Sequence, residues 1–300
     1  MRPVAVAAVL VAGVLLAACS GPRSRPGSAG AGHRGVPGTT SPAGESGIRD
    51  DLSRPQSSRY RDGNDSVPPP FDVSKLPEPV PKAEPRSRYG NKSPYTVRGK
   101  TYRVLPTARG YDERGIASFY GNKFHGYKTS NLETYDMYAF TAASTTLPLP
   151  SYARVTNLDN GKSVIVRVND RGPFHDNRLI DLSYAAAVKI GIWPKGTGLV
   201  EVRGIDPAHP AELPAPAAVS GTHPGIYLQV GAFADAANAS RLARRLRAAS
   251  LGAVQVQDAT VRGQRLHRVR VGPLGSVERA DEVSRRIERM GLPQPQVAVD

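Results

Sequence analysis

Residues 163–174 read SVIVRVNDRGPF, and this stretch decides the fold of the middle of the chain. Val164, Val166 and Val168 recur at every second position, which is the period of a strand with one face against a core. The alternation stops at Asp170, and Gly172-Pro173 then supplies residues typical of a turn. The stretch therefore predicts a strand that delivers the carboxylate of Asp170 to the rim of a sheet or barrel.

Short strands and turns surround this stretch. Residues 154–157 and 199–203 are further strand candidates, and Asp159-Asn160-Gly161 is a hairpin turn signal between two strands. One helix is predicted over 184–190, with Ser183 as its N-cap. Many short strands with one or two short helices indicate a small β-barrel, which we assign to residues 95–207.

The C-terminal part of the chain contains an internal repeat with a spacing of 41 residues. Residues 228–233 (LQVGAF) recur as 269–274 (VRVGPL), and residues 242–246 (LARRL) recur as 283–287 (VSRRI). Each unit reads strand, helix, strand. Residues 223–300 are therefore expected to form a small βαββαβ domain, in which two amphipathic helices cover one face of a four-stranded antiparallel sheet. The other face of the sheet is left open for a ligand.

The N-terminus has the pattern of an export signal. Residues 4–18 are an uninterrupted run of apolar or small residues, too short for an ordinary membrane-spanning helix. The run ends in LAAC at Cys19, the single cysteine of the chain. This ending resembles the lipobox of bacterial lipoproteins, in which the cysteine is acylated; the alternative is a plain secretory signal with a chance cysteine. We expect residues 1–19 to be a lipoprotein signal peptide and Cys19 to carry a membrane anchor.

Two segments read as connections rather than domains. Residues 20–94 hold 13 of the 27 prolines, are rich in Gly and Ser, and are expected to form a disordered tether. Residues 208–222, rich in Pro and Ala, are a second linker.

The positive charge of the chain does not mark a nucleic-acid site. The formal net charge of +14 divides into +5 over residues 1–94, +5 over 95–207, −1 over 208–222 and +5 over 223–300. No basic block or nucleic-acid-binding motif accompanies it, so nucleic acid is not an expected partner. A single cysteine also excludes an internal disulfide framework and a zinc site with several cysteines.

A series of motifs in the middle domain resembles the rare lipoprotein A family. In chain order the motifs are GIASFYG (115–121), FHG (124–126), ETYDM (133–137), TAA (141–143), VTNL (155–158), VNDRGPF (168–174) and RLIDLS (178–183). The resemblance implies a double-psi β-barrel that acts as a lytic transglycosylase on peptidoglycan, without metal or cofactor. The lipobox and the C-terminal repeat agree with the family's domain order.

The chemistry of glycoside cleavage requires an acid to protonate the leaving oxygen, and usually a second carboxylate nearby. The resemblance implies that Asp170 is the acid/base and Glu133 the second functional carboxylate, with a pKa pushed away from that of its partner. From the residues alone, a turn aspartate that hydrogen-bonds its own backbone is the favoured interpretation of Asp170, and Glu133 could equally be a solvated loop residue. The barrel residues expected to contact the glycan are Tyr120, His125, Asn169 and Arg171, although an arginine beside a turn aspartate is often structural.

Two positions depart from the family pattern. The family often has Gly before the glutamate, where this chain has Leu132, and a leucine resists the positive φ that glycine permits, so the loop is expected to take another shape. The family also often has His eleven residues after the glutamate, where this chain has Ser144. Both departures raise the question of weakened activity.

The C-terminal repeat resembles the SPOR domain, a module that binds peptidoglycan. The resemblance implies a preference for septal glycan strands that lack stem peptides. Gln229 and Arg270 lie at matched strand positions of the two repeats, and Arg268 shares a face with Arg270. These three residues are the expected glycan contacts, with ordinary exposed strand residues as the alternative.

Together the resemblances imply an outer-membrane lipoprotein of a Gram-negative bacterium that cleaves naked glycan strands at the division septum. Two other functions stay open at this point. One is a non-catalytic glycan-binding or scaffolding lipoprotein of the same fold, and the other is a hydrolase that uses water at the same carboxylates. The sequence names no protein partner.

Overall fold

The computed structural model describes residues 50–52, 60, 72–209, 215, 224–261 and 263–300. Cys19, most of the predicted tether and most of the 208–222 linker lie outside these residues. Within the described residues, no helix is both long and apolar enough to span a membrane.

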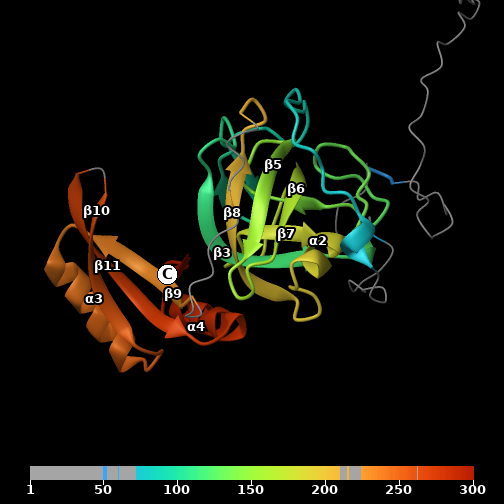
Figure 1. Ribbon diagram of the computed structural model, residues 1–300. Helices are drawn as coiled ribbons and strands as arrows, with labels where there is room; N and C mark the ends of the chain where they lie inside the picture. Colours follow the sequence, from blue (N-terminus) through green and yellow to red (C-terminus); the bar gives the residue numbers. More distant parts are fainter. Residues whose placement is uncertain (1–49, 53–59, 61–71, 210–214, 216–223, 262) are drawn as a thin grey trace, which may run out of the picture. The chain divides into compact units, whose positions relative to one another are not determined.

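The middle domain is a closed six-stranded barrel, as the sequence predicts (Figure 1). Around the barrel the strands run in the order β3, β7, β4, β6, β5, β8. Their bounds are β3 Asp112–Tyr120, β4 Thr141–Ala143, β5 Ser151–Asn157, β6 Ser163–Asp170, β7 Ile180–Ser183 and β8 Thr197–Ile205. The pairs β3–β7 and β4–β6 are parallel, whereas the other four neighbouring pairs are antiparallel.

The local predictions around the opening stretch are confirmed. Strands β5 and β6 form the expected hairpin, and Gly161 in its turn has a φ of +72°. Val164, Val166 and Val168 are fully buried and pack in the barrel core with residues such as Ala153. Helix α2, Tyr184–Lys189, has Ser183 as its N-cap, and the Ser183 hydroxyl accepts a hydrogen bond from the Ala186 N–H. A short 3₁₀ helix, η2, covers Asn122–Phe124.

Residues 72–94 differ from the predicted tether, because they pack along the barrel. They comprise the 3₁₀ helix η1, Val73–Lys75, and an extended segment up to the hairpin of β1, Tyr95–Val97, and β2, Lys100–Tyr102. Val73 and Leu76 contact the barrel core, and the Ser87 N–H donates to the Leu149 carbonyl at 2.8 Å. We name residues 72–94 the strap. Its prolines suit this packing because an extended segment without its own hydrogen bonds can lie against another surface.

The C-terminal domain confirms the repeat-based prediction. Its four strands are β9 Ile226–Phe233, β10 Val254–Val261, β11 Gln264–Leu274 and β12 Gln296–Val299, in the sheet order β10-β11-β9-β12, all antiparallel (Figure 1). Helices α3, Ala236–Ala248, and α4, Val277–Arg289, pack on this sheet, and buried apolar residues from both helices and the strands form one core. Each helix turns its buried apolar residues toward this core.

Candidate active site

Asp170 is the last residue of β6, at an irregularity in the barrel. The register between β4 and β6 shifts there, since Ala142 pairs with Val168 and Ala143 with Asp170. Asn169 is thus the extra residue of a β-bulge, a feature that changes the direction of side chains at barrel rims. Gly172 follows with a φ of +149°, which residues with a Cβ rarely adopt. The chain can therefore turn sharply away after presenting Asp170.

One oxygen of the partly buried Asp170 carboxylate accepts three hydrogen bonds. Its Oδ1 receives the Ser130 hydroxyl at 2.6 Å, the Ser130 N–H at 2.8 Å and the Arg171 N–H at 2.7 Å. Burial raises the pKa of Asp170 above its ordinary value, although these hydrogen bonds and the Arg171 charge act to lower the pKa. In the described part of the chain all hydrogen bonds to this carboxylate go to Oδ1. Oδ2 is thus the oxygen suited to carry a proton.

The pKa of Glu133 is shifted in the opposite direction. Its Oε1 accepts from Asn131 Nδ2 at 2.9 Å and from Arg167 Nη2 at 2.8 Å, and its Oε2 accepts from Arg167 Nη1 at 2.5 Å and from Asn169 Nδ2 at 2.9 Å. Burial acts to raise the pKa of Glu133, but the hydrogen bonds from Arg167 and Asn169 outweigh it and keep the pKa below its usual value. Its side chain is 39% exposed, so this ionised carboxylate borders on solvent.

The two carboxylates are brought together by one loop and one strand. Ser130 and Asn131 are consecutive and bind Asp170 and Glu133 respectively, whereas Asn169 is adjacent to Asp170 and binds Glu133. The repulsion that we expected between the two carboxylates is not what shifts their pKa values. Burial acts on Asp170 and the Arg167 guanidinium on Glu133. The arrangement nevertheless raises the pKa of one carboxyl group and lowers the pKa of the other.

Leu132 adopts the conformation that glycine would adopt at this position. Its φ is +68°, and its N–H closes a turn on the Thr129 carbonyl at 2.9 Å. The resistance of leucine to a positive φ therefore does not prevent this backbone conformation here. The hydrogen bonds that Thr129, Ser130 and Asn131 make hold the loop in place, and the leucine accepts a strained backbone.

Ser144 occupies a structural position. Its side chain is buried, and its hydroxyl oxygen accepts the N–H groups of Thr146 at 3.2 Å and Leu147 at 3.1 Å. Its own N–H donates to the Asp170 carbonyl at 3.1 Å. The serine thus stabilises the turn after β4 and supplies no titratable group.

Arg171 binds backbone atoms of other segments. Its Nε donates to the Gly90 carbonyl at 2.6 Å, and its Nη1 donates to the carbonyls of Ser144 and Leu147 at 2.8 and 2.6 Å. Burial lowers the pKa of Arg171 to about 10. Its side chain therefore ties the strap to the turn after β4, while only its N–H contacts the Asp170 carboxylate.

The two aromatic candidates are occupied by contacts within the protein. Tyr120 is 8% exposed, and its ring stacks on Tyr135 with centroids 4.2 Å apart. Its ring therefore has little exposed surface for the glycan contact that the sequence predicts. His125 is more exposed, but its Nδ1 accepts the Met137 N–H at 3.2 Å. Asn169, expected to contact the glycan, is buried and orients Glu133 instead.

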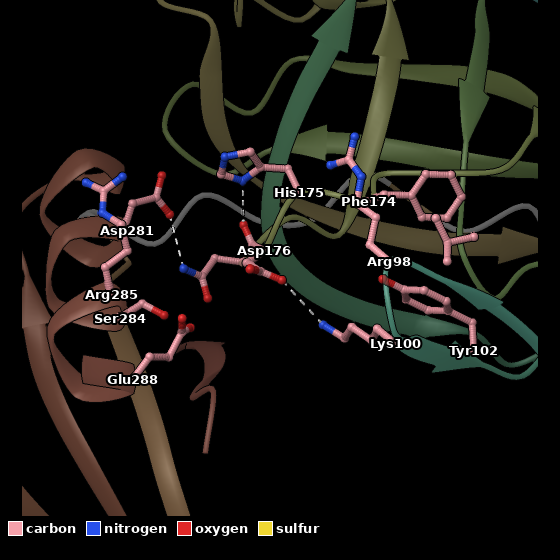
Figure 2. Close-up of a pocket in the computed structure, with 12 residues that line it drawn as sticks. Arg98, Lys100, Tyr102, Phe174, His175, Asp176, Asp281, Ser284, Arg285 and Glu288 are labelled. Atoms are coloured by element: carbon pink, nitrogen blue, oxygen red, sulfur yellow. Dashed lines mark hydrogen bonds and ion pairs between the residues drawn. The ribbon is translucent and has the colours of Figure 1, made fainter. Parts of the chain in front are cut away.

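The turn after Asp170 packs against the β1–β2 hairpin. Phe174 packs edge-on against Tyr102 with centroids 5.9 Å apart, and the Asp176 carboxylate lies 3.8 Å from Lys100 Nζ. Figure 2 shows Lys100 and Asp176 reaching toward each other, with His175 bonded to the Asp176 carbonyl at 2.9 Å. The hairpin thus braces the segment that carries the acid.

Four polar residues of the site were not identified from the sequence. Ser130 binds Asp170, and Arg167 binds Glu133. Arg167 and Asn169 are two apart on β6, so strand periodicity alone indicated that they share a face. Asp181 accepts from the Ser118 hydroxyl at 2.5 Å, and burial and the Asp170 charge raise its pKa. The fourth, Glu84, comes from the strap.

A row of polar residues crosses the sheet of the C-terminal domain. Gln229 pairs with Arg270 of β11 on one side and with Gln296 of β12 on the other, and Arg270 pairs with Gln255 of β10. Arg270 is 7% exposed and donates to the Asp300 carboxylate at 2.5 Å. Arg268 pairs with Gln257 in the next row. The three expected glycan contacts therefore lie on neighbouring positions of β9 and β11.

Two family models match the two folded domains. A family model described as lytic transglycolase matches residues 112–203, and the SPOR domain model matches residues 222–297. The crystal structure of the RlpA SPOR domain from Pseudomonas aeruginosa matches at 36% identity, with a TM-score of 0.24, and covers 25% of this chain and 97% of that chain.

Two curated relatives carry the same name, endolytic peptidoglycan transglycosylase RlpA. The one from Vibrio cholerae is 55% identical over 148 residues, which cover 49% of this chain and 56% of the relative. The one from Pseudomonas aeruginosa strain UCBPP-PA14 is 43% identical over 315 aligned residues, which cover 84% of this chain and 88% of the relative. The chain belongs to the RlpA family of endolytic peptidoglycan transglycosylases.

Proposed function

We propose that this protein cleaves glycan strands that lack stem peptides and leaves 1,6-anhydro-muramic acid ends, with Asp170 as the acid/base. The observation that carries the proposal is that β6 and the 129–133 loop hold Asp170 and Glu133 in one hydrogen-bond network, in which burial raises the pKa of Asp170 and Arg167 lowers that of Glu133. Glycoside cleavage uses such a pair, because the acid must hold a proton while a fixed negative charge faces the developing cation.

The reaction can be written with Asp170 alone moving the proton. Asp170 Oδ2–H protonates the glycosidic oxygen, the bond from C1 to that oxygen breaks, and the sugar at C1 becomes an oxocarbenium ion. The Asp170 carboxylate then takes the proton of the C6 hydroxyl, and that oxygen bonds to C1. The anhydro product forms without water, and Asp170 ends the cycle protonated.

Glu133 contributes charge rather than a proton in this scheme. Its four hydrogen-bond donors leave it ionised, and an ionised carboxylate near C1 stabilises the oxocarbenium ion electrostatically. Ser144 supplies no proton carrier, and the scheme needs none beyond Asp170.

The remaining parts of the chain support action at the cell envelope. A lipid on Cys19 would hold the protein on the periplasmic face of the outer membrane, and the SPOR domain would bring it to stem-peptide-free glycan at the division septum. Gln229, Arg268 and Arg270 are the residues we assign to that glycan contact. Peptidoglycan carries carboxylates, so the evenly spread positive charge of the chain suits this partner.

Digestion of stem-peptide-free glycan with the full-length protein tests the proposal. We expect anhydro-muramyl products from the wild type and a loss of at least about a hundredfold in Asp170→Asn, which keeps the shape of the side chain but holds no transferable proton. Asp159→Asn, the same change in the β5–β6 turn, is the matched control and is expected to keep full activity.

Three outcomes contradict parts of the proposal. Products with reducing ends would show a hydrolase that uses water. No products from a folded, glycan-binding wild type would show a scaffolding protein. Full activity in Asp170→Asn would remove Asp170 from the chemistry.

A further inference from the structure

Arg167 joins two carboxylates that come from distant parts of the chain. Its Nε and Nη2 donate to Oε1 and Oε2 of Glu84, each at 2.9 Å. Its Nη1 and Nη2 donate to Oε2 and Oε1 of Glu133, at 2.5 and 2.8 Å. Both edges of the planar guanidinium are therefore used, each by two hydrogen bonds, which fixes its plane as well as its position.

Glu84 reaches Arg167 because the strap is attached on both sides of it. Before Glu84, Glu78 Oε2 accepts the Ile165 N–H at 3.0 Å. After it, Asn91 exchanges two hydrogen bonds with the backbone of Leu149, at 2.6 and 2.9 Å. Glu84 lies outside the residues that match the lytic transglycolase model, which begin at 112. The strap thus adds a charged group to the site from outside the barrel strands.

A charged group in this position needs a physical reason. The side chains of Glu84 and Arg167 are only 19% and 20% exposed, so both charges lose most of their hydration. Packing a strap does not require a desolvated carboxylate, since an amide or apolar residue would serve as well. On the side of Arg167 away from Glu133, the Glu84 carboxylate is the hydrogen-bond partner that stops the long arginine side chain from rotating.

We propose that Glu84 is a positioning residue of the transglycosylase site, acting through Arg167 on Glu133. The inference rests on the role proposed above for Glu133. Loss of the Glu84 charge frees Arg167 to leave the plane in which it meets both oxygens of Glu133. The catalytic carboxylate then loses its fixed place, and displacements of this kind reduce the rate of the chemical step more than substrate binding.

The test compares steady-state cleavage of stem-peptide-free glycan by variants of the full-length protein. Glu84→Gln is expected to lower kcat about tenfold and to leave KM within about twofold. Glu78→Gln is the matched control: it makes the same change on the same strap and keeps an acceptor for the Ile165 N–H, and within the described part of the chain Glu78 has no hydrogen bond or ion pair with Arg167. Its kcat is expected to stay within about twofold of the wild type.

A double-mutant cycle separates positioning from simple attachment of the strap. Arg167→Lys removes the two-edged contact, so Glu84→Gln in that background is expected to lower kcat by less than about twofold more. Thermal unfolding of each variant, measured alongside, defines a temperature at which all are folded. Full multiplication of the two losses would contradict the proposal.

The same series distinguishes the two proposals. If Glu133→Gln is inactive while Glu84→Gln has the kcat of the wild type, Glu84 only attaches the strap and the proposed reaction stands. If Glu133→Gln keeps wild-type activity, the proposed role of Glu133 is wrong, and the positioning role of Glu84 is wrong with it.

Discussion

Ser130 donates both its hydroxyl and its backbone N–H to one oxygen of Asp170, at 2.6 and 2.8 Å. The hydroxyl favours the charged form of the carboxylate and so lowers its pKa, against the burial that raises it. Ser130→Ala is therefore expected to raise the pKa of Asp170 further. The protonated acid would persist to higher pH, and the alkaline limb of the rate profile would move upward in pH.

The pH dependence of the cleavage rate checks this prediction. Ser130→Thr, which keeps the hydroxyl, is the matched control and should have the profile of the wild type. An unchanged alkaline limb in Ser130→Ala would mean that Asp170 is not the group that titrates there.

The acidic groups on Arg167 predict how stability depends on pH. Hydrogen bonds from Arg167 are the main cause that lowers the pKa of Glu84 from 4.5 to about 2, and the pKa of Glu133 is lowered as well. A carboxylate with a lowered folded-state pKa stabilises the fold above its unfolded pKa, and this contribution is lost as the pH falls through the folded value. The Tm should therefore fall from pH 4.5 toward pH 2.

Thermal unfolding over this pH range measures the effect. In Glu84→Gln the fall in Tm should be shallower, because one of the two carboxylates with a lowered pKa is gone. Glu78→Gln, which leaves the contacts between Glu84 and Arg167 in place, should follow the wild-type slope; equal slopes in all three proteins would disprove the linkage to Glu84.

The strained backbone at Leu132 predicts a stabilising substitution. A left-handed φ of +68° costs a residue with a Cβ about 1–2 kcal/mol, whereas glycine adopts it freely but costs up to about 1 kcal/mol more entropy in the unfolded chain. Leu132→Gly is thus expected to raise the free energy of unfolding by about 0.5–1 kcal/mol. Leu132→Ala keeps the Cβ and should show no gain, and chemical denaturation of the three proteins measures both values.

Ser144 is expected to matter for stability and not for the proton transfer. Ser144→Ala leaves the partly buried N–H group of Thr146 and the buried N–H group of Leu147 without their acceptor, at a cost of about 1–3 kcal/mol. Because the hydroxyl does not ionise at neutral pH and its oxygen serves two backbone N–H groups, the variant should keep kcat within about threefold when assayed well below its Tm. A loss comparable to that of Asp170→Asn would assign Ser144 to the reaction.

Strand periodicity and the internal repeat were sufficient to predict both folded domains. The valines of β6 and the turn at Gly161 predicted the hairpin, because alternation and turn chemistry act over a few residues. The strap was predicted wrongly for the same reason. Its composition is that of disordered chain, and nothing within residues 72–94 encodes the Leu149 carbonyl, Arg167 or Arg171 that hold it.

The charge and cysteine patterns, the motif order and the placement of Asp170 at the end of a strand are local properties, and the amino-acid sequence alone determined them. Only the tertiary structure decided which groups surround Asp170 and Glu133. The four donors on Glu133 come from segments as far apart as residues 131 and 169, and the donors on Asp170 from residues 130 and 171. Protonation preferences depend on solvation and on through-space contacts, and the closed barrel creates both when it brings β6, the 129–133 loop and the strap together.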